Sequence, residues 1–151
     1  MRIFIRLACL IFLVVSLNTM GQTFEVNEIG DTINFKDKNG LKQGYWKEKD
    51  RAITSKGYYK DDVKHGIWTK YYPKGTVSDV KNYKNGKQDG ISLHFEQRGY
   101  LRSEKYFKNG ELHGLAKTYR YGSTPKSKIN YRHGKKHGKA QLYYENGKLQ
   151  E

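Results

Sequence analysis

The 151-residue sequence has one cysteine, two prolines and no apolar run long enough to span a bilayer. The only cysteine, Cys9, lies in an N-terminal apolar segment. Beyond that segment, disulfides, thiol nucleophiles and cysteine-ligated zinc sites are therefore excluded. Apolar residues make up only 36% of the chain, and leucine, isoleucine and valine are too few for a conventional two-layer core.

Catalytic signatures are also missing. The sequence has neither a G-x-S-x-G motif nor a Walker loop, and its acids are scattered among lysines without a distinct pair, as at Asp61, Asp62, Asp79 and Asp89. Only a glycosidase-type pair of carboxylates, distant in sequence, stays open as an alternative. We expect no enzyme and no cofactor.

Histidine is the residue type that most invites a metal site. Three of the five histidines recur at one position of a repeated pattern, directly before Gly66, Gly114 and Gly138, and they are His65, His113 and His137. Gln43 and Asp89 hold the same position in other copies of the pattern, which indicates a role in a repeated motif. We therefore expect no metal site.

Residues 1–21 have the pattern of a secretory signal peptide. Arg2 and Arg6 precede the apolar run from Leu7 to Val15, and Thr19 and Gly21 supply small residues at a cleavage site. The run is shorter than the roughly 20 residues that span a bilayer, so we predict cleavage near Gln22. An uncleaved N-terminal anchor is the alternative. The exported chain would be periplasmic, bound to the cell envelope or extracellular.

Tyrosine and glycine are abundant, with 13 and 16 copies. Aromatic residues favour strands and glycine serves turns of positive φ, so the composition predicts many short strands and almost no helix. One glycine recurs at Gly44, Gly66, Gly90, Gly114 and Gly138, in steps of 22, 24, 24 and 24 residues. A fixed period in this range is typical of stacked supersecondary units.

Each unit is predicted to be a β-hairpin. A second glycine precedes the repeat glycine by four residues in most units, and segments such as 86–90 are expected to be loops between antiparallel strands. The fold class is all-β, an elongated single-layer antiparallel meander of about five hairpins. We place the units at 39–57, 58–81, 82–105, 106–129 and 130–151, after an N-terminal capping hairpin at 22–38.

Side-chain alternation predicts how the sheet is decorated. Residues one, three and five after each repeat glycine share a face, which is expected to be the more apolar one because it carries Ile67, Ile91 and Leu115. The fifth-position column is expected to pack along the sheet and contains Tyr71, Phe95, Tyr119 and Tyr143. An exposed aromatic strip for sugars or a partner is the alternative.

Trp46 and Trp68 each follow their repeat glycine by two residues, where later units have small side chains. They either cover a wider gap in the sheet or form a binding platform.

Lysines gather near the repeat glycines. Without residues 1–21 the chain has 27 basic and 15 acidic residues, a net charge of +12. The candidate binding lysines are expected to lie in loops along one edge, and they are Lys42, Lys64, Lys87, Lys135 and Lys136. They either bind an anionic partner or keep the sheet edge soluble.

These patterns resemble MORN repeats. The resemblance rests on K-N-G-K-x-x-G, on the His-Gly pairs and on the segments Tyr71 to Gly75 and Tyr143 to Gly147, and it is closest to the bacterial variant. Asp62, which replaces a glycine, and the early Gly122 depart from the pattern. The resemblance implies a non-catalytic binding scaffold. Some eukaryotic members are associated with acidic phospholipids, and part of the bacterial group carries an antitoxin label.

Two function classes follow. The first is an exported scaffold that binds an anionic lipid or cell-wall polymer or a protein partner. The second is an antitoxin or immunity-type protein that neutralises a toxin. Export makes nucleic acid an unfavoured ligand, and the mature chain is expected to have no transmembrane span.

Overall fold

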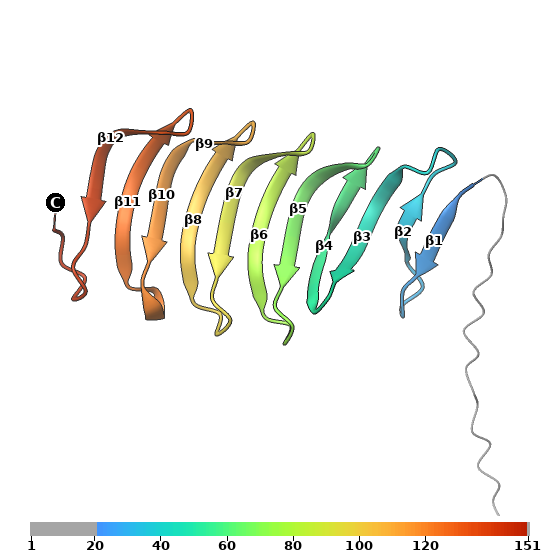
Figure 1. Ribbon diagram of the computed structural model, residues 1–151, viewed down its shortest axis with the longest axis horizontal. Coiled ribbons are helices and arrows are strands. Elements are labelled where there is room, and N and C mark those ends of the chain that lie inside the picture. Colours follow the sequence, from blue (N-terminus) through green and yellow to red (C-terminus); the bar gives the residue numbers. More distant parts are fainter. Residues whose placement is uncertain (1–20, 151) are drawn as a thin grey trace, which may run out of the picture.

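The computed structural model describes residues 21–150, which form one open antiparallel sheet of twelve strands (Figure 1). The strands are β1 (Thr23–Val26), β2 (Thr32–Lys36), β3 (Lys42–Asp50), β4 (Ile53–Lys60), β5 (Val63–Tyr71), β6 (Val77–Lys84), β7 (Lys87–Phe95), β8 (Leu101–Lys108), β9 (Glu111–Leu112), β10 (Gly114–Tyr119), β11 (Pro125–Arg132) and β12 (Lys135–Leu142). Among the described residues the one helical element is a 3-10 turn, η1 (Tyr121–Ser123).

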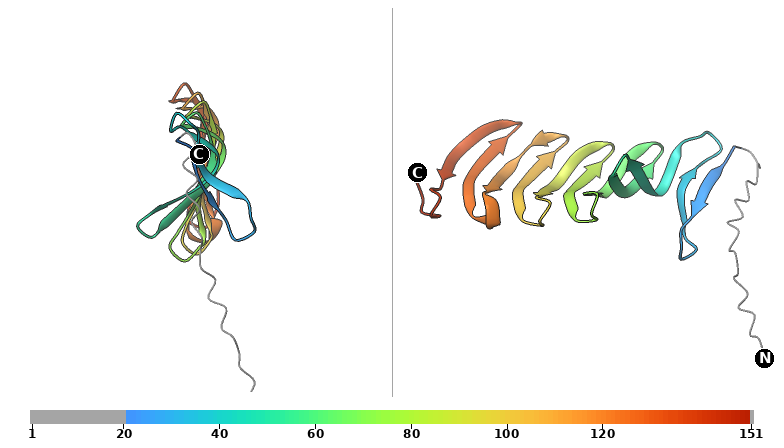
Figure 2. Two further views of the ribbon diagram at one scale, coloured as in Figure 1. Left: turned by 90° about the vertical axis from the view of Figure 1, so that its right-hand side faces the viewer. Right: turned by 60° about the horizontal axis from the view of Figure 1, so that its bottom comes forward.

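The strands pair in chain order, each antiparallel to its neighbours. The short strand β9 lies off this path and pairs with β8. Seen from its end, the sheet is a single twisted layer (Figure 2). The prediction of an elongated single-layer meander is confirmed.

The N-terminal end of the sheet is formed by β1 and β2. β1 and β2 pair in the region expected for a capping hairpin, with Thr23 opposite Lys36. Its role as a cap stays a prediction, and the expected signal peptide lies outside the described residues except for Gly21. No helix within residues 21–150 has the length and apolar character needed to cross a membrane.

The connections differ from the expected loops at one edge of the sheet. Residues 86–90 were expected to form a loop, but β7 begins at Lys87 and a two-residue turn, Asn85-Gly86, joins it to β6. This correction has a simple reason. Asn-Gly closes a hairpin by itself, because both residues tolerate positive φ.

The repeat glycine is a bulge within a strand. Tyr58 pairs with His65 and Lys56 with Thr69, so Gly57 of β4 lies opposite three residues of β5, Gly66–Trp68. Gly66 has a φ of 67°, which suits glycine. The same pattern recurs at Gly90 and Gly138. The strands bend near these positions, so the hairpin ends fold over the sheet (Figure 1).

The core is thin and lies mainly on the face that was not expected to be the apolar one. The buried apolar residues are Ile33, Trp46, Trp68 and Ala116, and the last three follow a repeat glycine by two residues. Ile67, on the opposite face, is 60% exposed. We call the two sides the tryptophan face, with Trp46 and Trp68, and the histidine face, with His65 and Ile67. The prediction was wrong because tryptophan covers more area than isoleucine in a sheet without a second layer.

Candidate functional site

Four two-residue turns form one edge of the sheet, which we call the tip edge. In each turn both residues have positive φ, as in Asn85 (50°) and Gly86 (76°), which is the geometry of a type I′ turn. The turns are Asp61-Asp62, Asn85-Gly86, Asn109-Gly110 and His133-Gly134. Asp61 and Asp62 adopt the same conformation without glycine.

Each tip is hydrogen-bonded to the preceding one. The N–H of Gly86 donates to the carbonyl of Lys64 at 3.0 Å, and the N–H of Gly110 donates to that of Gln88 at 2.7 Å. The equivalent bonds at the first and last tips join Asp62 to Lys42 and Gly134 to Leu112. These bonds hold the four tips in a continuous row.

Carboxylates at the tips are engaged by the protein itself. Asp62 accepts a bond from the N–H of Lys42 at 2.8 Å, and Asp89 accepts one from the N–H of Asn109 at 3.1 Å. Asp61 accepts a bond from the Gln43 amide at 2.7 Å. These acids therefore fasten successive tips together, and the neighbouring cations are left to face solvent.

The predicted lysines do not form one row. Lys64 pairs with Tyr59 and Lys136 with Tyr131, so both belong to the tryptophan face. Lys87 pairs with Lys84, and Lys135 with Arg132, on the histidine face. All four lie in strands, as does Lys42. The loop placement was wrong, and adjacent strand residues point to opposite faces.

The structure brings two predicted lysines onto the two tryptophans. The Lys42 Nζ lies 4.6 Å from the centre of the Trp46 ring, and the Lys64 Nζ lies 3.9 Å from that of Trp68. Such contacts are cation–π interactions. The bulge makes them possible, because residues four apart on a straight strand would be too far apart to touch.

The two indole side chains are buried in the sheet and are not exposed to a partner. Trp46 is 8% exposed and Trp68 is 5% exposed. Both meet the ring of Tyr59 edge-on, with centroid distances of 5.8 and 5.0 Å. Their N–H groups donate to the carbonyls of Gln43 and Tyr58. This arrangement favours the gap-covering interpretation over a binding platform.

Glu48 completes this cluster. It pairs with Lys42 at 2.7 Å and accepts a hydrogen bond from the Tyr59 hydroxyl at 3.0 Å. Burial acts to raise the pKa of Glu48, but these two hydrogen bonds outweigh it and hold the pKa below its ordinary value. Burial, then the Glu48 carboxylate, raises the pKa of Tyr59 strongly. Burial also lowers the pKa of Lys64. Lys42 and Lys64 are thus part of the packing.

A different set of cations is free at the tip edge. The residue before each tip turn is basic, exposed and on the histidine face, and we call this set the tip row: Lys60, Lys84, Lys108 and Arg132. Lys60, Lys84 and Lys108 lie near the candidate lysines in the sequence but were not among the candidates, and Arg132 was not predicted. The sequence pattern that could have identified these four residues is their fixed position, one residue before each turn.

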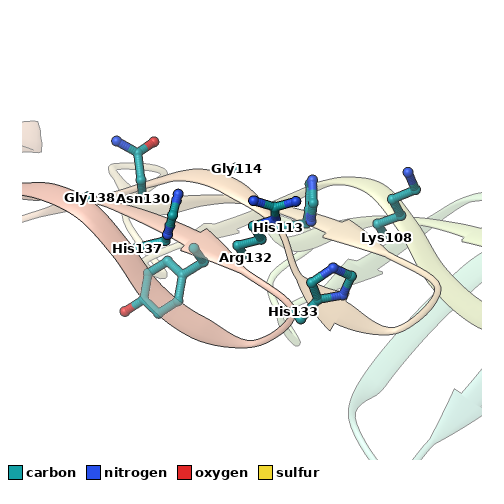
Figure 3. A pocket seen from close by; sticks show the side chains of 9 residues that line it. Lys108, His113, Gly114, Asn130, Arg132, His133, His137 and Gly138 are labelled. Carbon is teal, nitrogen blue, oxygen red and sulfur yellow. The ribbon is translucent and has the colours of Figure 1, made fainter.

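Hollows lie between successive tips. The last one, between the third and fourth tips, has a volume of about 580 Å³, and its basic and histidine lining residues are Lys108, His113, Arg132, His133 and His137. In Figure 3 the Arg132 guanidinium lies beside His113, with Lys108 and His137 on either side and their nitrogen ends pointing the same way. The preceding hollow, of about 600 Å³, includes Asp89 in its lining.

The histidines do not form a metal site among the described residues, where no group of three or more potential ligands could hold an ion. His113 and His133 have ring centres 5.8 Å apart, and His133 lies 3.3 Å from Glu111. What the arrangement offers chemically is the positive charge of Lys108 and Arg132 beside the imidazole groups, which suits an anion.

The repeat glycines and the fifth-position aromatics occupy equivalent places along the sheet. All five repeat glycines have positive φ. Three of the aromatics end a strand and Tyr143 follows β12, and all four are half-buried: Tyr71, Phe95, Tyr119 and Tyr143. Lys56 lies over Tyr71 and Lys128 over Tyr143, which adds cation–π contacts to this column.

Comparison with family models matches residues 64–85 and 136–151 to the family described as MORN repeat variant. At these two segments the chain is similar to the MORN repeat variant. The first segment spans most of β5 and β6, and the second begins in β12. MORN repeats form a non-enzymatic family of binding and scaffold repeats. Comparison with curated proteins finds no match.

Proposed function

We propose that the chain is an exported, non-catalytic MORN-type scaffold that binds an anionic polymer or an anionic envelope or membrane surface along its tip edge. The tip row carries this proposal. It supplies one exposed cation per hairpin on a single face, while Asp61, Asp62 and Asp89 are hydrogen-bonded within the tips.

The spacing of the tip row suits an extended ligand. Two strands separate successive members, which places them about 10 Å apart. This distance exceeds the screening length of about 8 Å at physiological salt, so the cations repel each other little. A chain of negative charges can contact several of them at once, and each further contact then forms at high effective concentration.

A protein partner is the second candidate, in the form of a toxin that the chain would neutralise. The large side chains exposed on the histidine face include Tyr58 (52%), Ile67 (60%) and Tyr106 (39%). Exposed aromatic and aliphatic residues of this kind are typical anchors of protein interfaces. Replacing Tyr58 and Ile67 by serine should abolish neutralisation of such a toxin and leave anion binding unchanged.

The test of the first candidate reverses the charge of the whole tip row. Lys60, Lys84, Lys108 and Arg132 are changed to glutamate together, and binding to vesicles rich in phosphatidylglycerol and to an anionic wall polymer is measured by cosedimentation. The matched control reverses four exposed lysines away from the tips, Lys49, Lys74, Lys126 and Lys148, and has the same net charge.

We expect the parent to bind and to lose affinity steeply with salt. The tip-row variant should lose binding by at least about tenfold, because it removes four attractive contacts and adds four repulsive ones. The control should retain most of it. Equal losses in both variants would mean that only net charge matters, and the tip edge would then have no special role.

A further inference from the structure

The hollow between the third and fourth tips differs from its neighbours in its charge. At the two positions directly before a repeat glycine, the preceding hollow has Asp89 and His113, and this one has His113 and His137. The lining of this last hollow includes no carboxylate. Glu111, which lines an adjoining hollow with Lys108 and His113, lies 3.3 Å from His133.

Four of its side chains are free to bind. Among residues 21–150, no hydrogen bond or ion pair engages the side chains of Lys108, His113, Arg132 or His137. These groups come from β8, the segment between β9 and β10, β11 and β12, so four separate segments contribute to the hollow. In Figure 3 these side chains lie beside one another, with Arg132 and His113 between His137 and Lys108.

We propose that this hollow is a binding site for a phosphate group. The inference rests on the proposed function, because it names the group that one place on the tip edge would hold. An arginine can bind two oxygens of an anion in a fork. Lys108, His113 and His137 add further donors from neighbouring segments, so more than two oxygens of one anion can be bound, which suits a tetrahedral oxyanion better than a planar carboxylate.

The repeat supplies a variant that keeps the fold. His113→Asp places at this position the residue that the preceding unit already has, and Asp89 there accepts a hydrogen bond from the N–H of Asn109 at 3.1 Å. His133 is equivalent to Asn109, so the new carboxylate can make the same bond. A second variant, Arg132→Gln, removes the guanidinium group. The control is Lys84→Gln at the preceding tips.

The experiment titrates the ¹⁵N-labelled protein with inorganic phosphate at constant ionic strength and follows NMR shifts. We expect saturable shifts confined to the segments around His113, Arg132 and His137, and weaker shifts with acetate. His113→Asp and Arg132→Gln should each weaken binding by at least about tenfold, because each removes a donor to the anion. Lys84→Gln should change it less than about twofold.

A comparison of two ligands distinguishes the possible sources of the phosphate group. Tighter binding of inorganic phosphate than of dimethyl phosphate points to a terminal phosphate, and the reverse order points to a phosphodiester polymer or a lipid headgroup. Shifts that are spread along the tip edge and insensitive to His113→Asp would overturn the inference, as would the absence of shifts. The proposed function survives either result if the tip-row variant still loses vesicle or polymer binding, and fails with the inference if the parent binds neither.

Discussion

Gly57 lies between the two tryptophans on neighbouring strands. It pairs with Trp46 on one side, and a Cβ built on it would come within 2.3 Å of the Trp68 ring on the other. The two indoles can cover this part of the sheet because β4 has no side chain there. The large indole side chains therefore fill the space that is left by the missing side chain of Gly57.

We predict that Gly57→Ala destabilises the protein by about 1–3 kcal/mol, the usual cost of overpacking a tight site. The measurement is the free energy of unfolding in urea. Ser55→Ala, on the same face of β4, should have a much smaller effect. Adding Trp68→Ala to Gly57→Ala should recover part of the loss relative to the sum of the single changes. Full additivity would show that the indole does not pack on this backbone.

Single residues also show what the sequence could predict. Glycine positions were informative because positive φ is a local requirement, and Asn85-Gly86 specifies its turn without help from distant residues. The face of the sheet to which the Lys64 side chain points could not be predicted from the local sequence. It depends on where β5 begins, and on a bulge that brings Lys64 over Trp68.

At the level of the hairpin, each unit is fastened to its neighbours at both edges. The tips are linked by backbone bonds such as Gly110 N to Gln88 O. At the opposite edge, the Arg120 guanidinium donates to the carbonyl of Pro125 at 2.9 Å and to that of Tyr143 at 2.7 Å. The bonds from Gly110 to Gln88 and from Arg120 to Tyr143 join adjacent units, so stability should be nearly a sum of unit and interface terms.

Truncation after Thr124 tests whether the stability of each hairpin depends only on its neighbours. It removes β11 and β12 at a hairpin boundary, together with the Arg120 links. We expect a folded protein that keeps most of its β-sheet signal in circular dichroism and melts at a lower temperature, because the remaining hairpins keep their neighbours. Complete loss of the signal would contradict a nearest-neighbour array.

Hairpin repetition was predictable, but the tip edge was not. The period of the glycines gave the number of units and the antiparallel order. The tip row depends on bonds between successive tips and on carboxylates such as Asp62 and Asp89, which cap backbone N–H groups of another hairpin. These contacts join residues about 20 positions apart, beyond the reach of local patterns.

At the level of the whole molecule, the sheet is a long single layer with two distinct edges. The tip edge carries the tip row and the hollows, and the opposite edge carries wider turns such as the one closed by Tyr72 and Thr76. An elongated sheet of this kind has enough length to place several cations against one ligand. The central claim is that the ligand lies along the tip edge.

The most direct measurement is an NMR map of the ¹⁵N-labelled protein with a short dextran sulfate, a polyanion without phosphate. The account predicts shifts at all four tips, around Lys60, Lys84, Lys108 and Arg132, that decline together as salt is added. The turn at Pro73–Gly75, at the opposite edge, should stay unchanged. Shifts that are strongest at that turn, or uniform over both edges, would contradict it.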